Sequence, residues 1–107
     1  MSNLTDRERG FEAHFALDAE QEFKAQARRD RMLGHWAGEK MGLTGDHLAE
    51  YATSVLRADL KEPGDEDVFR KIAADFADSG VECSASELRT KMDQFLATAR
   101  NEIKEGR

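Results

Sequence analysis

The sequence contains little of what stabilises secreted or membrane-inserted proteins. Cys83 is the single cysteine, so no internal disulfide can form, which suits a reducing cytoplasm. No run of about 18 apolar residues is present to span a bilayer, and the N-terminus lacks the basic-then-apolar pattern of a secretory signal. With 107 residues and one proline, the chain is expected to be a small, cytoplasmic, helix-rich domain that does not insert into a membrane.

Signals of catalytic or metal chemistry are equally sparse. His14, His35 and His47 are not spaced to pair at i+3 or i+4, and Cys83 is distant from all three. A zinc site needs four well-placed ligands, and a calcium loop needs spaced oxygen ligands that the acidic run 65–67 lacks. The sequence also contains no glycine-rich phosphate loop and no nucleophile elbow. We therefore expect a protein that is not an enzyme and holds no metal or cofactor.

The acidic charge of the chain is concentrated in its middle. Ten acidic and four basic residues lie between Thr44 and Cys83, which accounts for the whole net charge of −6. Because phosphate neutralisation needs a basic surface, nucleic acid is not expected as a partner. The one basic cluster consists of Arg28, Arg29 and Arg31. Its chemistry suits a phosphate or an acidic partner, although a solvated helix face is the commoner explanation of such a cluster.

Start and stop signals divide the chain into four helical segments, and no stretch alternates as a strand does. Capping boxes are indicated at Thr5-Asp6-Arg7-Glu8 and at Ser84-Ala85-Ser86-Glu87. Gly42, Pro63 and Gly80 are the expected stops. The fold class expected is all-α, a four-helix bundle with a long, partly disordered N-terminal helical extension. The expected helical segments begin at Thr5, after Thr44, at Asp65 and after Ser84, and the first runs to about Met41.

The first segment presents two apolar faces if it forms one straight helix. At about 100° per residue, Leu4, Phe11 and Phe15 fall within roughly 40° of one another on the helix surface. Phe23 is rotated by about a further 80°. We assign the later face, near Phe23 and Ala27, to the core of the protein itself, and the earlier face to a partner.

Approximate energies support this division of the first segment. Burying each large apolar side chain before Asp18 gains at most roughly 2–3 kcal/mol. Ordering the backbone of some 15 residues costs on the order of 1–2 kcal/mol for each residue. A short, charged helix is marginal in water, so residues 1–18 are predicted to be mobile when free and helical when a partner covers them. Residues 19–107 are predicted to form the bundle domain.

Several features of the first segment occur together in a known family. A capped charged helix, paired phenylalanines, a double arginine and Gly-x-Trp-Ala follow in that order in DRERGFEAHFALDAEQEFKAQARRDRMLGHWAGEKMG. The later part of the chain contains ADLKEPGDEDVFRKIAADFADSGVECSASELRTKM. In these two stretches the chain resembles the zeta-subunit inhibitors of α-proteobacterial F-type ATP synthases.

The resemblance implies a function as well as a fold. In that family a protruding N-terminal segment enters an interface between an α and a β subunit of the catalytic head, reaches towards the central stalk and blocks ATP hydrolysis. The partner would then be the catalytic head, with its α, β and central-stalk subunits, and the protein would be cytoplasmic and peripheral to the inner membrane. Paired aromatic anchors on a charged helix suit a helix-in-groove binder. By position, the candidates for direct contact with the partner are Arg7, Glu8, Arg9, Phe11, Glu12 and Phe15.

Two other functions are compatible with the residues. One is a small helical module that binds a nucleotide near Arg28, Arg29 and Arg31. The other is a general interaction or assembly module without inhibitory activity. The free protein is expected to be a monomer.

Overall fold

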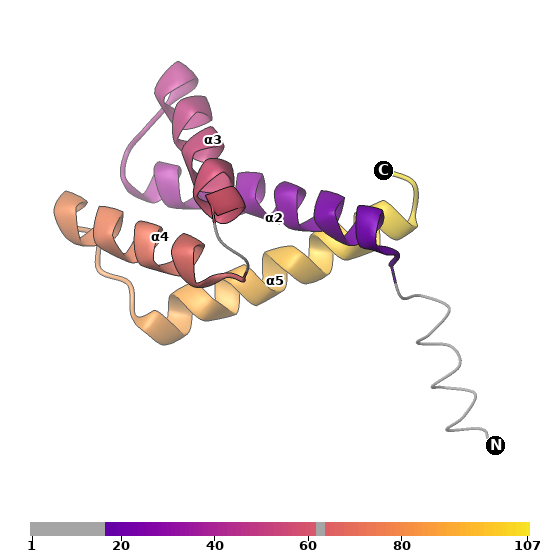
Figure 1. Cartoon of the computed structure of the whole chain (residues 1–107). Helices are drawn as coiled ribbons and strands as arrows, with labels where there is room; N and C mark the ends of the chain where they lie inside the picture. The colour runs from indigo at the N-terminus through magenta and orange to yellow at the C-terminus, as the bar shows by residue number, and fades with distance from the viewer. Residues whose placement is uncertain (1–16, 62–63) are drawn as a thin grey trace.

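The computed structural model describes residues 17–61 and 64–107, which form four helices and the segments that connect them (Figure 1). Residues 1–16 and 62–63 lie outside this description, and with them the predicted cap at Thr5 and the predicted N-terminal extension. Within the described residues no strand occurs, and the predicted all-α, four-helix fold is confirmed. The helices are α2 (Ala19–Lys40), α3 (Gly45–Lys61), α4 (Glu66–Ser79) and α5 (Ala85–Lys104).

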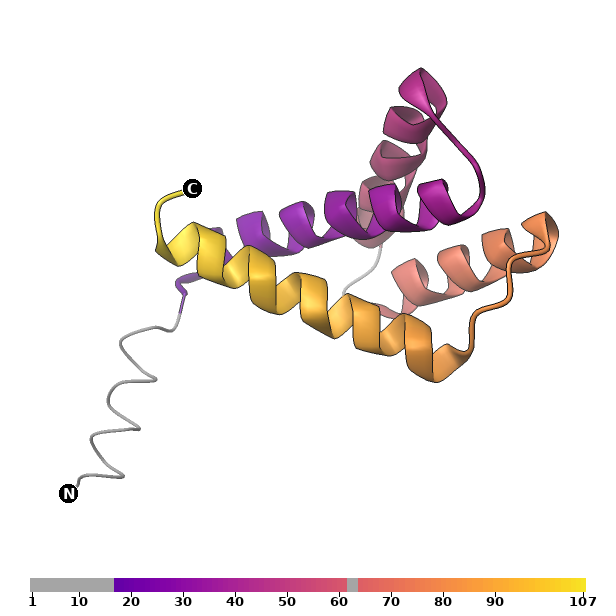
Figure 2. The same cartoon turned by 180° about the vertical axis from the view of Figure 1, so that it is seen from behind.

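Helix α2 is the centre of the bundle, because its packing against α3 and α5 is the most extensive among the four described helices. Helices α2 and α5 lie side by side and run in opposite directions, which brings the start of α2 to the end of α5 (Figures 1 and 2). Helix α3 crosses α2, and α4 contacts both α3 and α5. The core takes residues from all four helices: Leu33, Ala37, Val55, Val68, Ile72, Phe76, Leu88 and Met92.

Local signals set the ends of α4 and α5, as predicted. Gly80 ends α4 with a φ of 73°, a left-handed conformation that favours glycine. The capping box at the start of α5 is formed, since the Glu87 backbone N–H donates to Ser84 Oγ at 3.0 Å. These short-range hydrogen bonds depend only on neighbouring residues, so the sequence pattern is sufficient to find them.

A second capping box, at Asp18, interrupts the helix that was predicted to run from Thr5 to Met41. The Gln21 backbone N–H donates to Asp18 Oδ1 at 2.8 Å, and Gln21 Oε1 accepts from the Asp18 N–H at 3.2 Å. Asp18 itself has an extended backbone, with φ −75° and ψ 176°, so α2 begins only at Ala19. The prediction of one continuous helix was wrong at this residue, although the Asp-x-x-Gln pattern was present to indicate it.

The close packing of α2 on α3 depends on a glycine. A Cβ atom on Gly34 would lie 2.6 Å from the Cα atom of Ala52, which is backbone and cannot rotate away. Glycine costs about 1 kcal/mol relative to alanine inside a helix. Here the absence of a side chain lets the two helices approach each other closely.

Candidate functional site

The residues predicted to contact a partner directly, Arg7 to Phe15, lie outside the described part of the chain. Their roles stay predictions, as does the division of the chain at residue 18. The described residues that adjoin them belong to the first half of α2. Two features occur there: a buried arginine among aspartates, and an apolar groove between α2 and α3.

The three arginines of the basic cluster have different surroundings. Arg28 forms an ion pair with Glu102, with 3.0 Å between Nη1 and Oε1, and also donates to the backbone carbonyl of Arg107. Arg31 is exposed, whereas Arg29 is only 1% exposed. The expectation of a solvated helix face was therefore wrong for Arg29, because successive residues of a helix point about 100° apart.

Arg29 lies among three aspartates, and we call these four residues the Arg29 cluster. Its Nε atom donates to Asp30 Oδ1 at 2.7 Å, and Nη2 donates to Asp65 Oδ1 at 2.9 Å. Nη2 also lies 3.8 Å from Asp59 Oδ2. Because these carboxylates come from α2, from the end of α3 and from the residue before α4, the cluster ties three parts of the fold together.

The Arg29 cluster contains three carboxyl groups and one guanidinium group. This excess of carboxyl groups favours the protonated form of the buried Asp30. Burial, and then the hydrogen bond to Asp59, raise the pKa of the Asp30 carboxyl to about 8, although the Arg29 charge opposes both. Asp30 Oδ2 has no donor among the described residues, so the neighbouring carboxyl of Asp59 can pair with it only through a shared proton. Burial lowers the pKa of Arg29, but its bonds to Asp65 and Asp30 outweigh this, so the net shift is upward.

The raised pKa of Asp30 predicts that the protein loses stability as the pH rises. Between the ordinary aspartate pKa of about 3.9 and the folded value of about 8, the folded state binds a proton that the unfolded state does not. The free energy of unfolding should therefore decrease from about pH 4 to about pH 8 through this group. Replacing Asp30→Asn keeps a neutral side chain at every pH, so denaturant titrations of this variant should show a flatter profile than those of the parent.

The parent itself is the control for the other titrating groups, because only the difference between the two profiles reports on Asp30. If the two profiles run parallel from pH 5 to pH 9, Asp30 is ionised in the folded state and this assignment is wrong.

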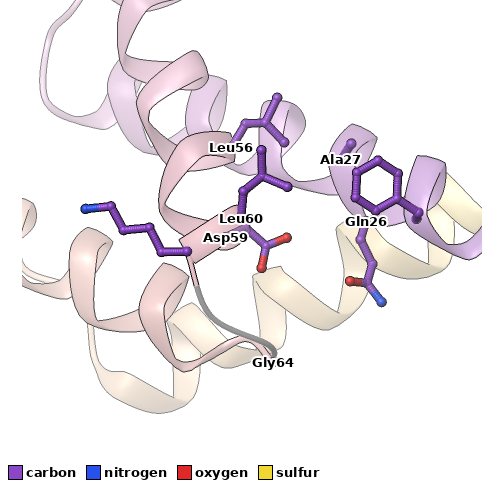
Figure 3. A pocket seen from close by; sticks show the side chains of 8 residues that line it. Gln26, Ala27, Leu56, Asp59, Leu60 and Gly64 are labelled. Carbon is purple, nitrogen blue, oxygen red and sulfur yellow. The ribbon is translucent and has the colours of Figure 1, made fainter.

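The second feature is an apolar groove between α2 and α3, which we call the Phe23 groove. It encloses about 320 Å³. Figure 3 shows Gln26 and Ala27 of α2 facing Leu56, Asp59 and Leu60 of α3 across it. The residues that line the groove are Phe23, Gln26, Ala27, Leu56, Asp59, Leu60, Lys61 and Gly64.

The assignment of Phe23 to the core was wrong. Phe23 is 58% exposed, and so is Leu60 on the opposite side of the groove. The inward stripe of α2 is instead formed by Ala25, Leu33 and Ala37, at four-residue steps that also include Arg29. The four-residue spacing could have predicted that Arg29 is buried. It was overlooked because a positively charged side chain is expected on the surface.

Other polar groups of the described bundle do not form a catalytic arrangement. Tyr51 Oη donates to Asp75 Oδ2 at 2.7 Å, and burial together with this bond raises the pKa of the phenol, which keeps it neutral. Burial also raises the pKa of the Cys83 thiol, so little of the reactive thiolate forms. Among residues 17–61 and 64–107, no three histidine, cysteine or acidic side chains are grouped to hold a metal ion.

No helix in the described part of the chain is both long enough and apolar enough to cross a bilayer.

The comparisons with known proteins also include residues that lie outside the described part of the structure. A protein-family model described as ATPase inhibitor subunit zeta matches residues 1–102. A solved structure described as "Solution NMR structure of the protein" is 35% identical to this chain, with a TM-score of 0.69. That likeness covers 80% of this chain and 98% of the other. A search of the curated proteins gave no match.

Proposed function

The chain belongs to the ATPase inhibitor subunit zeta family, and from this membership we propose that it inhibits ATP hydrolysis by inserting its N-terminal segment into the head of an F-type ATP synthase. The family match is the observation that carries the proposal, because it extends from residue 1 to residue 102 and so includes both the segment and the bundle. It also agrees with the family resemblance found in the sequence. The protein is thus associated with ATP synthase as a regulatory subunit, and the finer mechanism is our proposal.

In this proposal the segment becomes helical at an interface between an α and a β subunit. Phe11 and Phe15 fill apolar pockets, while Arg7 and Arg9 pair with carboxylates at the entrance. Glu8 and Glu12 lie on the same predicted helix and contact basic groups of the partner. Rotation of the central stalk in the hydrolysis direction drives this helix deeper, and rotation in the synthesis direction expels it.

The bundle supplies a rigid support for the inserted segment. The α2 helix starts at Ala19, fixed by the cap at Asp18, and its packing against α3 and α5 holds the point from which the segment emerges. We propose that the protein is a monomer when free. We further propose that it lies in the cytoplasm and reaches the inner membrane only through the enzyme.

Nucleotide binding at the three arginines receives less support from the structure. Arg29 is already paired with Asp30, Asp59 and Asp65, and a phosphate would have to compete with them in a site of net negative charge. Arg28 is paired with Glu102, which leaves Arg31 as the exposed member of the cluster. A phosphate site built from all three arginines is therefore not proposed.

The proposed function is tested by adding the purified full-length protein to the cognate ATP synthase or its soluble head and measuring ATP hydrolysis. We expect hydrolysis to fall with increasing protein until it saturates, and ATP synthesis to be less affected because the rotor turns the other way. Unchanged hydrolysis at saturating protein, with binding still measurable, would instead identify a general assembly module. Heat-unfolded protein serves as the control for non-specific effects.

A further inference from the structure

The carboxyl groups of Asp30 and Asp59 form a pair that is almost closed to solvent. Asp30 is fully buried, and the side chain of Asp59 is 11% exposed. Asp30 Oδ1 accepts from Arg29, which leaves Oδ2 beside the carboxyl of Asp59 and without another donor among the described residues. Two ionised carboxylates in hydrogen-bond contact repel each other, so the pair needs a shared proton. That proton joins α2 to the last turn of α3, which ends at Lys61.

The charged groups around this carboxyl pair do not replace the proton. Arg29 of α2 is the buried cation, and Asp65, before α4, adds a third carboxylate. On α5, Arg100 also acts on the cluster, but it is paired with Glu22 of α2. Lys61 at the end of α3 is exposed, so solvent screens its charge. With the proton bound the Arg29 cluster has one more negative than positive charge, and without the proton it has two more.

Asp59 is the carboxylate of the cluster that Arg29 holds least firmly. Arg29 Nε lies 2.7 Å from Asp30 Oδ1. Arg29 Nη2 lies 2.9 Å from Asp65 Oδ1 but 3.8 Å from Asp59 Oδ2. Arg29 and Asp30 are neighbours on α2 and cannot separate, whereas the last turn of a helix has carbonyl groups without intrahelical partners and frays easily. When the proton leaves, repulsion should therefore move Asp59 and its turn of α3.

The earlier part of α3 is fixed on α2 and in the core. The backbone of α2 at Gly34 lies against Ala52, and Val55 is fully buried. Beyond Val55, the α3 side chains at positions 56, 59, 60 and 61 line the Phe23 groove, which Figure 3 shows between α2 and the end of α3. The last turn can therefore move away from α2 and widen the groove while the core stays packed.

We propose that the Asp30–Asp59 pair is a proton-controlled switch. With the shared proton bound, the last turn of α3 closes on α2; without it, the turn moves away and the Phe23 groove opens. The proton passes to water through the groove, which Asp59 lines. This regulation goes beyond the proposed inhibition and does not depend on it. Because burial raises the pKa of Asp30 to about 8, the closed form is favoured below that pH and is lost as the pH rises through it.

The test follows the Cα chemical shifts of the full-length protein by NMR at pH 6 and pH 9. Release of one proton raises the open-to-closed ratio up to about tenfold for each pH unit below the pKa, so we expect a rise of about 10–100-fold. Residues 58–61 should lose their helical shifts, whereas the shift of Ala52 should not change. Asp30→Asn should stay closed at both pH values, because its amide can donate to Asp59 as the protonated carboxyl does. The matched control is Asp93→Asn, an exposed position on α5, which should behave as the parent does.

A second measurement needs no variant. The carboxyl carbons of Asp30 and Asp59 in the parent should titrate together near pH 8. Separate titration of both groups near about pH 4 would mean that they share no proton and would overturn the switch. It is also overturned if residues 58–61 keep their helical shifts at pH 9, or if Asp30→Asn loses them as the parent does. A change in Trp36 fluorescence over the same pH range would overturn it as well, because this ring packs against Phe76 and its change would show that the whole bundle opens.

Discussion

Removing residues 2–16 should abolish inhibition of ATP hydrolysis while leaving the bundle folded. The deleted segment contains all six predicted partner contacts, from Arg7 to Phe15. It ends before Leu17 and Asp18, and this boundary matters because Asp18 caps α2. Deleting Asp18 as well would remove a capping interaction worth about 1 kcal/mol and would confuse a stability effect with a functional one. Hydrolysis by the cognate enzyme and the thermal unfolding midpoint are the two measurements.

A chain of the same length, with residues 2–16 replaced by glycine and serine, is the matched control. This chain should also fail to inhibit, because a segment of the same length without the phenylalanine and arginine side chains has no groups that bind the partner. The fluorescence of Trp36, the single tryptophan, reports on the bundle in each variant, since this ring packs edge-on against Phe76 in the core. Full inhibition by either altered chain would place the inhibitory surface on the bundle instead.

Replacing Arg29→Met should cost about 3–5 kcal/mol of unfolding free energy, a large share of the stability of a small domain. Methionine fills much of the same volume but leaves Asp59 and Asp65 without their buried cation. The loss should be larger at pH 9 than at pH 6, because a protonated Asp30 leaves less negative charge uncompensated. Denaturant unfolding followed by circular dichroism measures both values.

The exposed Arg31 provides the control for this substitution. Arg31→Met removes the same charge from the same helix, and we expect its effect to stay within about 0.5 kcal/mol. Equal effects of the two substitutions would mean that the net charge of α2, and not the buried cluster, is responsible.

The predictions that rested on short-range sequence patterns were the most reliable. Gly80 and the Ser84 capping box were predicted correctly because each hydrogen bond there joins residues close in the chain. The cap at Asp18 was equally local, and it was missed because the charged helical pattern continues across it. The family was also recognised from the order of residues alone, and the family model confirms it.

Predictions about which side chains are buried were less successful, because burial depends on residues far apart in the chain. Phe23 was assigned to the core from its helical position, yet it is exposed at the groove between α2 and α3. Arg29 was assigned to solvent from its charge, yet it is buried by carboxylates of Asp59 and Asp65, about 30 or more positions later in the sequence. A helix pattern gives the angles between side chains, but not the direction in which the neighbouring helices lie.

The sequence by itself determined the all-α class, the ends of the later helices and membership of the ATPase inhibitor subunit zeta family, because helical periodicity, caps and motif order are written in neighbouring residues. Only the tertiary structure decided that Arg29 is a buried tie between three parts of the fold and that Phe23 is left open on the surface. The reason is the crossing of α3 over α2, permitted by Gly34. The packing of α3 on α2 brings Asp59 to the arginine, whereas Phe23 stays exposed beside the groove between the two helices.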